Sequence, residues 1–201
     1  ALVKLHASGW TDAALRAGSI SVGFDLWRAI GVAYASAYGR YAADAHPCGY
    51  RYSALGADLS PRASTDAERA AWWADASGIP PGAGVAIVDP NPLADAGLTG
   101  LQCLRALSTG DSADARRVRT GIAETRAGLP RAGLPVIVLH GTDDGLVPQA
   151  FSSAPYVAMA QAAGRDVRYW QVRNSQHFDA FLGFPQYGAV YLPLLPYVYE
   201  A

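Results

Sequence analysis

The sequence predicts an α/β fold in which a parallel βαβ unit follows a mostly helical region. Val136-Ile137-Val138-Leu139 is a short, continuous, β-branched run, typical of a strand buried on both faces of a sheet. Residues 148–163 have a helical pattern that stops at Gly164, and residues 167–172 have the composition of the next strand. Strand, helix and strand at this spacing favour a right-handed crossover in a parallel sheet.

The region before these elements differs in composition, because it is rich in Ala and is interrupted by Gly and Pro. We therefore divide the chain into a mostly helical cap or lid region, residues 1–130, and a carboxyl-terminal core, residues 131–201. In the closing segment, Pro193 and Pro196 are expected to interrupt any helix. The cap is expected to contain helices over residues 25–43 with a break near Gly31, 64–76 after a Ser/Thr cap, 98–108 and 112–127.

Composition excludes several classes of function. With 51% apolar and 16% charged residues the chain is globular, and 16 basic against 17 acidic residues give no charge excess for nucleic acid or an anionic membrane surface. No apolar run approaches the roughly 20 residues that a membrane span needs. Cys48 and Cys103 are the only cysteines and lie in no metal-ligand pattern, so no metal site is expected. They form either a disulfide, if the protein is exported, or two free thiols.

Two polar segments follow the two predicted core strands, at residues 140–148 and 174–178. Functional groups gather at the carboxyl ends of parallel strands. The first segment contains H-G-x-x-D-x-x-V-P, which resembles the acid loop of α/β-hydrolases. The resemblance places the catalytic acid at Asp144 and the base at His177, since the order in that fold is nucleophile, acid, histidine. The imidazole would take a proton from a serine, and the carboxylate would orient the imidazole.

Other residues compete for these roles. Asp143 is the alternative acid, although an Asp in a Gly-containing loop is usually a turn former. His140 is expected to be a structural residue that closes the strand. His6 and His46 have no partner that the sequence identifies.

The serine nucleophile is not identified. A nucleophile elbow needs G-x-S-x-G, and no such pentapeptide occurs in the 201 residues. In the nearest candidate, residues 34–38, tyrosines replace both glycines, so Ser36 is expected to be an ordinary helix residue. We expect the nucleophile and the oxyanion-hole donors upstream of Ala1, in a fragment or processed chain. Such a chain would expose an apolar sheet edge and be poorly soluble unless the missing amino-terminal segment or a partner chain completed the sheet.

Longer stretches carry a closer resemblance. They are LPVIVLHGTDDGLVP at 134–148, AFSSAPYV at 150–157, YWQVRNSQHFDAFL at 169–182 and LLPY at 194–197, with a looser match over the cap region at 47–104. These residues resemble the D-(-)-3-hydroxybutyrate oligomer hydrolases, whose members are several times longer. The resemblance implies a serine esterase that cleaves 3-hydroxybutyrate oligomers in polyhydroxybutyrate degradation. It also implies a secreted or periplasmic protein with a small ester substrate and no metal or organic cofactor.

Two alternative hypotheses about the function remain open. The same acid and histidine loops serve esterases, thioesterases and peptidases of other acyl specificity. The missing elbow also fits a non-catalytic fragment or subunit, and the isolated chain is expected to be inactive. The aromatic residues of the cap either line an acyl pocket or pack its core: Tyr50, Tyr52, Trp72 and Trp73.

Overall fold

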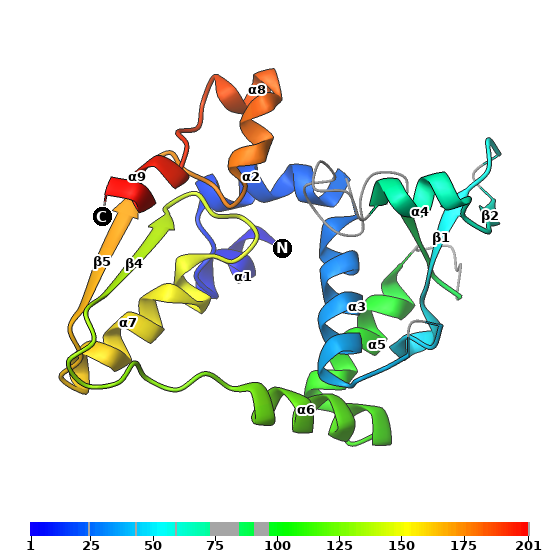
Figure 1. Cartoon of the computed structure of the whole chain (residues 1–201), viewed down its shortest axis with the longest axis horizontal. Coiled ribbons are helices and arrows are strands. Elements are labelled where there is room, and N and C mark those ends of the chain that lie inside the picture. The colour runs from blue at the N-terminus through cyan, green and yellow to red at the C-terminus, as the bar shows by residue number, and fades with distance from the viewer. Residues whose placement is uncertain (24, 43, 59, 73–84, 91–96, 201) are drawn as a thin grey trace. The chain divides into compact units, whose positions relative to one another are not determined.

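A computed structural model describes the chain, except residues 24, 43, 59, 73–84, 91–96 and 201 (Figure 1). Contacts divide it into two compact units. We call Trp27–Arg126 the continuous unit and Ala1–Leu26 with Ala127–Ala201 the discontinuous unit. No sequence pattern indicated that the first 26 residues group with the carboxyl-terminal part. The functional division into cap and core stays a prediction. None of the described helices is long and apolar enough to cross a membrane.

The discontinuous unit is built on two parallel strands that lie side by side, β4 (Val136–Gly141) and β5 (Val167–Val172) (Figure 1). Between them the chain forms a 3-10 turn, η3 (Gln149–Phe151), and the helix α7 (Ser153–Ala162). Buried side chains of α7 pack with residues of both strands: Val157, Ala160, Val167, Val136 and Val138. The predicted strand, helix and parallel strand are therefore confirmed.

The expectation that the first strand is buried on both faces is wrong for this chain. Successive side chains of a strand point to opposite faces, and α7 packs against Val136 and Val138. Ile137, between them, is 37% exposed, and Trp170 on β5 is 38% exposed. Within the described residues the parallel sheet has two strands. Its face opposite α7 keeps apolar side chains in contact with solvent.

Short helices complete the discontinuous unit. They are α1 (Leu2–Ala7), α2 (Asp12–Gly23), η4 (Asp179–Gly183), α8 (Pro185–Gly188) and α9 (Leu195–Glu200). The buried Tyr187 donates a hydrogen bond from its hydroxyl to the carbonyl oxygen of Ala17 (3.2 Å), which ties α8 to α2. Pro196 lies within α9 and does not prevent that helix, because the first turn of a helix needs no hydrogen bond from the proline nitrogen.

The four helices that the sequence predicts for the cap are present, with bounds that differ by up to five residues at the ends that the structure describes. They are α3 (Leu26–Tyr38), α4 (Asp66–Trp72), α5 (Leu98–Thr109) and α6 (Ala113–Thr125). Helix α3 is not broken at Gly31, and it ends before Arg40, whose φ of 51° is left-handed. The Ser112 hydroxyl caps α6 by accepting from the Ala115 amide (3.0 Å). Three buried residues from α3, α5 and α6 form the core: Ala35, Leu107 and Val118.

A three-stranded antiparallel sheet in the continuous unit was not predicted, so the region is less purely helical than its composition indicates. Its order is β2 (Pro61–Arg62), β1 (Arg51–Leu55), β3 (Val85–Val88). The strands are short, and β1 pairs with β3 from far along the chain, with Arg51 opposite Val88. Local patterns carry little information about such distant pairing.

Cys48 and Cys103 form a disulfide, which decides between the two alternatives that the sequence left open. The bond joins the turn η1 (Pro47–Gly49) to α5 and closes a sequence separation of 55 residues. Both cysteines belong to the continuous unit, so the cross-link acts within that unit alone.

Candidate active site

Backbone contacts tie the loop after β4 to the loop after β5. A Cβ atom on Gly141 would lie 2.2 Å from the carbonyl oxygen of Ser175, so only glycine allows this approach. The amide of Thr142 donates to the carbonyl of Val172 (2.9 Å), and the amide of Asp143 donates to the carbonyl of Ser175 (3.0 Å). The acid loop and the histidine loop are therefore held as one piece at the carboxyl ends of both strands.

The closing segment fixes the histidine loop. Asn174 has a φ of 53°, a left-handed conformation that Asn tolerates better than most residues. Its carbonyl accepts from the amide of Leu192 (2.6 Å), and the fully buried Ser175 donates from its hydroxyl to the Leu192 carbonyl (2.8 Å). These bonds lock the turn that presents His177.

The structure brings Asp144 and His177 together. Nδ1 of His177 lies 2.8 Å from Oδ2 of Asp144, whose side chain is only 6% exposed. The other carboxylate oxygen, Oδ1, accepts from the amides of Leu146 (2.9 Å) and Val147 (2.7 Å). The carboxylate is thus oriented by its own loop and meets the imidazole at the nitrogen that a catalytic acid would hold.

The electrostatics keep Asp144 ionised. Burial raises the pKa of Asp144, but hydrogen bonds from His140, His177 and the Val147 amide outweigh burial and hold that pKa well below its ordinary value of 3.8. An ionised carboxylate only accepts, so Nδ1 of His177 carries the shared proton and its Nε2 is left as an acceptor. Among the residues that the structure describes, Nε2 has no hydrogen-bond partner, and the side chain is 35% exposed. The arrangement can therefore take a proton from a group that approaches Nε2.

The competing acid occupies a different position. Oδ1 of Asp143 accepts from the Thr142 hydroxyl (2.7 Å), and no described hydrogen bond joins Asp143 to a histidine. Within the described part of the chain, Asp144 is the carboxylate that faces His177. The catalytic roles of both Asp144 and His177 stay predictions.

Sequence reasoning missed a contact of His140. This residue belongs to β4, as expected, but its Nε2 also lies 3.1 Å from Oδ2 of Asp144, the oxygen that His177 uses. The sequence signal for this contact is the position of His140, four residues before Asp144 in the same motif.

The remaining histidines have partners that the sequence did not identify. Nε2 of His6 lies 2.9 Å from Oδ1 of Asp12 on the exposed surface. Nδ1 of His46 lies 2.8 Å from the hydroxyl oxygen of Ser36, which is a residue of α3 as predicted. No carboxylate hydrogen-bonds to His46 among the described residues, so this serine and histidine lack a catalytic acid there.

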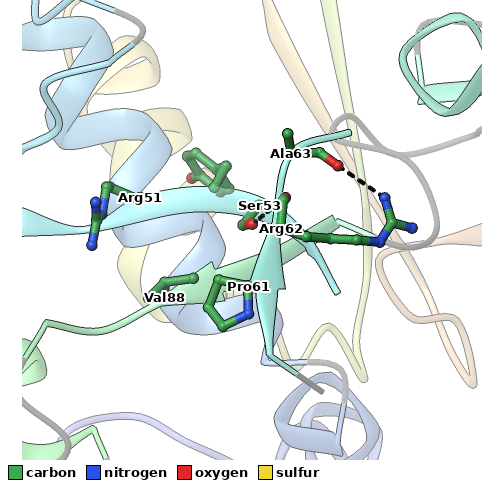
Figure 2. A pocket seen from close by; sticks show the side chains of 7 residues that line it. Arg51, Ser53, Pro61, Arg62, Ala63 and Val88 are labelled. Atoms are coloured by element: carbon green, nitrogen blue, oxygen red, sulfur yellow. Dashed lines mark hydrogen bonds between the residues drawn. The ribbon is translucent and has the colours of Figure 1, made fainter. Parts of the chain in front are cut away.

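The aromatic candidates for an acyl pocket separate into different environments. Tyr50 is 1% exposed and donates towards Oδ2 of Asp89 (3.4 Å), so it packs in the interior. Trp72 is the last residue of α4, and Trp73 lies outside the described residues. Tyr52 lines a pocket of about 430 Å³ on the antiparallel sheet, where Arg51 and Arg62 extend away from each other (Figure 2). Neither Asp144 nor His177 lines this pocket, whose other residues are Ser53, Pro61, Ala63 and Val88.

Within the described residues, no group of three or more His, Cys, Asp or Glu side chains is arranged to hold a metal ion. His140, Asp144 and His177 meet through hydrogen bonds at a single carboxylate oxygen instead. This arrangement supports proton transfer and charge stabilisation by side chains.

Comparisons with known proteins cover the whole chain. A family model described as 3HB-oligomer hydrolase (3HBOH) matches residues 1–201. Curated relatives named D-(-)-3-hydroxybutyrate oligomer hydrolase are 37% identical over 227 residues in Paracidovorax citrulli and 34% identical over 224 residues in Albidiferax ferrireducens. Each of these two alignments covers 100% of this chain and 32% of the relative, so the chain spans about a third of the length of these relatives. No solved structure matches.

Proposed function

Because the chain belongs to the 3HB-oligomer hydrolase family, we propose that the natural protein containing it cleaves ester bonds of 3-hydroxybutyrate oligomers in polyhydroxybutyrate degradation. Asp144 and His177 serve as the acid and base of a serine-type triad. The observation that carries the proposal is the 2.8 Å contact between Nδ1 of His177 and a buried carboxylate whose other oxygen is held by two amides. The names of the relatives support this substrate over other acyl compounds.

The proposed reaction is acyl transfer in two halves. Nε2 of His177 removes the proton of a serine hydroxyl, and the serine oxygen attacks the ester carbonyl. The tetrahedral intermediate collapses as His177 gives its proton to the leaving alcohol, which leaves an acyl-serine. Water, deprotonated by His177, then attacks the acyl-serine carbonyl. As this second intermediate collapses, His177 returns the proton to the serine oxygen and 3-hydroxybutyrate is released. Asp144 fixes the ring and stabilises the imidazolium formed in each half.

The proposal places the serine amino-terminal to Ala1, in an α/β-hydrolase core. An acid loop after one parallel strand and a histidine loop after the next support this fold, in which the nucleophile comes first along the chain. The 201 residues contain no G-x-S-x-G, and the relatives are about three times as long as the matched part. The same upstream segment would supply the oxyanion-hole donors and further strands of the sheet.

We also propose that the protein is secreted or periplasmic. The Cys48–Cys103 disulfide supports this location, because such bonds persist in oxidising compartments and are rare in reducing ones. Recovery of the protein from the cytoplasmic fraction with both thiols free would contradict the proposal.

The test uses the full natural protein and the linear 3-hydroxybutyrate dimer. Wild-type protein is expected to hydrolyse the dimer, and His177→Ala or Asp144→Asn to lower kcat by about 10⁴-fold, because the base is lost or its tautomer is wrong. His6→Ala is the matched control, since His6 also contacts a carboxylate, that of Asp12, but on the exposed surface. This control is expected to keep wild-type kcat.

A fluorophosphonate probe adds a second measurement. The full protein is expected to be labelled at one serine, whereas the 201-residue chain alone is expected to remain unlabelled. Labelling of the isolated chain at a serine would refute the upstream nucleophile. Full activity of the His177→Ala protein would refute the triad.

A further inference from the structure

Asp144 accepts hydrogen bonds from two histidines, and the proposed mechanism uses only one of them. We propose that His140 is a positioning residue: it holds Oδ2 of Asp144, the oxygen that orients His177, and it is itself held by Ser153 and Tyr169. This inference rests on the proposed function, because the positioning matters to catalysis only if Asp144 and His177 act as acid and base.

The first step in the argument is the saturation of the carboxylate. An ionised carboxylate has about four acceptor positions. Two are filled at Oδ1 by the amides of Leu146 and Val147, and two at Oδ2 by Nδ1 of His177 (2.8 Å) and Nε2 of His140 (3.1 Å). Because every position is taken, the buried carboxylate has no alternative partner towards which it can turn.

The second step is the direction of the hydrogen bonds beyond His140. Since Asp144 only accepts, Nε2 of His140 carries a proton, and Nδ1 of the neutral ring accepts. The Ser153 hydroxyl oxygen lies 2.6 Å from that Nδ1 and 2.7 Å from the Tyr169 hydroxyl oxygen. Each hydrogen bond then has one donor and one acceptor if the bonds run in one direction: Tyr169 donates to Ser153, Ser153 donates to His140, and His140 donates to Asp144.

The third step is where these residues come from. Tyr169 lies on β5, Ser153 is the first residue of α7, and His140 lies on β4, so the chain of bonds connects all three elements of the βαβ unit. Ser153 is 9% exposed and the His140 side chain 12% exposed. A buried polar network with all its bonds made is rigid. The orientation of the acid is therefore set by the sheet and α7 as well as by its own loop.

Substitutions at His140 separate positioning from packing. His140→Gln keeps a nitrogen donor at about the place of Nε2, whereas His140→Asn is one carbon shorter and cannot reach Asp144. Loss of a hydrogen bond to a charged group is expected to lower kcat for the dimer about tenfold in the His140→Asn protein, with KM unchanged within about twofold. The His140→Gln protein is expected to keep kcat within about threefold of wild type. His46→Gln in the continuous unit is the control and leaves both constants unchanged.

A spectroscopic measurement on the wild-type natural protein needs no variant and no activity. Long-range proton–nitrogen NMR at neutral pH is expected to show His140 protonated at Nε2 and unprotonated at Nδ1. A proton on Nδ1 of His140, or equal kcat in the Gln and Asn proteins, would overturn the inference. A protein without ester hydrolysis in which His140 has the expected tautomer would refute the proposed function while supporting the hydrogen-bond chain.

Discussion

Each unit of the molecule contains a serine hydroxyl hydrogen-bonded to Nδ1 of a histidine, and the two pairs differ in what lies beyond the ring. In the discontinuous unit Ser153 lies 2.6 Å from His140, whose other nitrogen bonds to Asp144. In the continuous unit Ser36 lies 2.8 Å from His46, whose ring meets the ring of Tyr52 edge-on at 4.9 Å. The two pairs therefore differ in what the ring meets: Nε2 of His140 meets a buried carboxylate, whereas the ring of His46 meets an aromatic ring.

The units also differ in how they are held together. The continuous unit has the only disulfide that the cysteines of the chain allow. The discontinuous unit contains no cysteine, and hydrogen bonds between its loops and strands set its geometry. Perturbations aimed at one kind of constraint should therefore affect one unit and spare the other.

Removal of the disulfide should have the largest effect on stability. Closing a loop of this length, a separation of 55 residues, corresponds to about 4 kcal/mol of chain entropy. The Cys48→Ala/Cys103→Ala protein is expected to show faster hydrogen exchange across residues 27–126, with unchanged protection in β4 and β5. Equal loss of protection in both units would contradict their independence.

Two glycines provide a matched pair of intermediate effect. A Cβ on Gly141 would lie 2.2 Å from the Ser175 carbonyl oxygen, and a Cβ on Gly121 would lie 1.9 Å from the Tyr38 carbonyl oxygen. Each change to Ala is expected to cost about 1–3 kcal/mol in denaturant unfolding, since backbone must move apart. Only Gly141→Ala should also lower kcat, because Ser175 belongs to the loop that presents His177. A fall in kcat for Gly121→Ala would contradict this assignment.

The smallest expected effects are those of the two serines. Ser153→Ala and Ser36→Ala each remove one hydrogen bond to a histidine and should cost about 1 kcal/mol of unfolding free energy. The Ser153→Ala protein should also lose about threefold in kcat, because the ring that holds Asp144 loses its own partner. Steady-state kinetics with the 3-hydroxybutyrate dimer as substrate distinguish the Ser153→Ala protein from the Ser36→Ala protein. Equal kcat values would contradict the difference expected between the two serine–histidine pairs.

Local patterns were sufficient for the elements whose contacts are close in sequence. The β-branched run at 136–139, the Gly164 stop and the strand at 167–172 predicted β4, α7 and β5, because each signal lies inside the element that it describes. The helical pattern at 112–127 predicted α6 for the same reason. Asp144 and His177 were placed near each other by strand order, and the structure joins them.

Features that depend on distant partners were not predicted. The pairing of β1 with β3 and the approach of α2 to the acid loop need residues far apart in the sequence: a Cβ on Gly145 would lie 2.1 Å from the Ala14 carbonyl oxygen. His140 was assigned only a strand-closing role, because its further partners, Ser153 and Tyr169, come from two later elements. Contacts of this kind produce no periodic pattern in the sequence, so sequence analysis could not predict them.

The separation of residues 1–26 from residues 127–201 has a consequence for synthesis. The whole continuous unit is synthesised between α2 and the acid loop on which α2 packs, so its helices can start to form while α2 lacks that partner. At typical rates of translation, the interval from residue 126 to His177 is on the order of several seconds. During that interval the face of α2 that carries Ala14 and Ala17 still lacks its partners, and exposed apolar surface of this kind promotes aggregation of an incomplete chain.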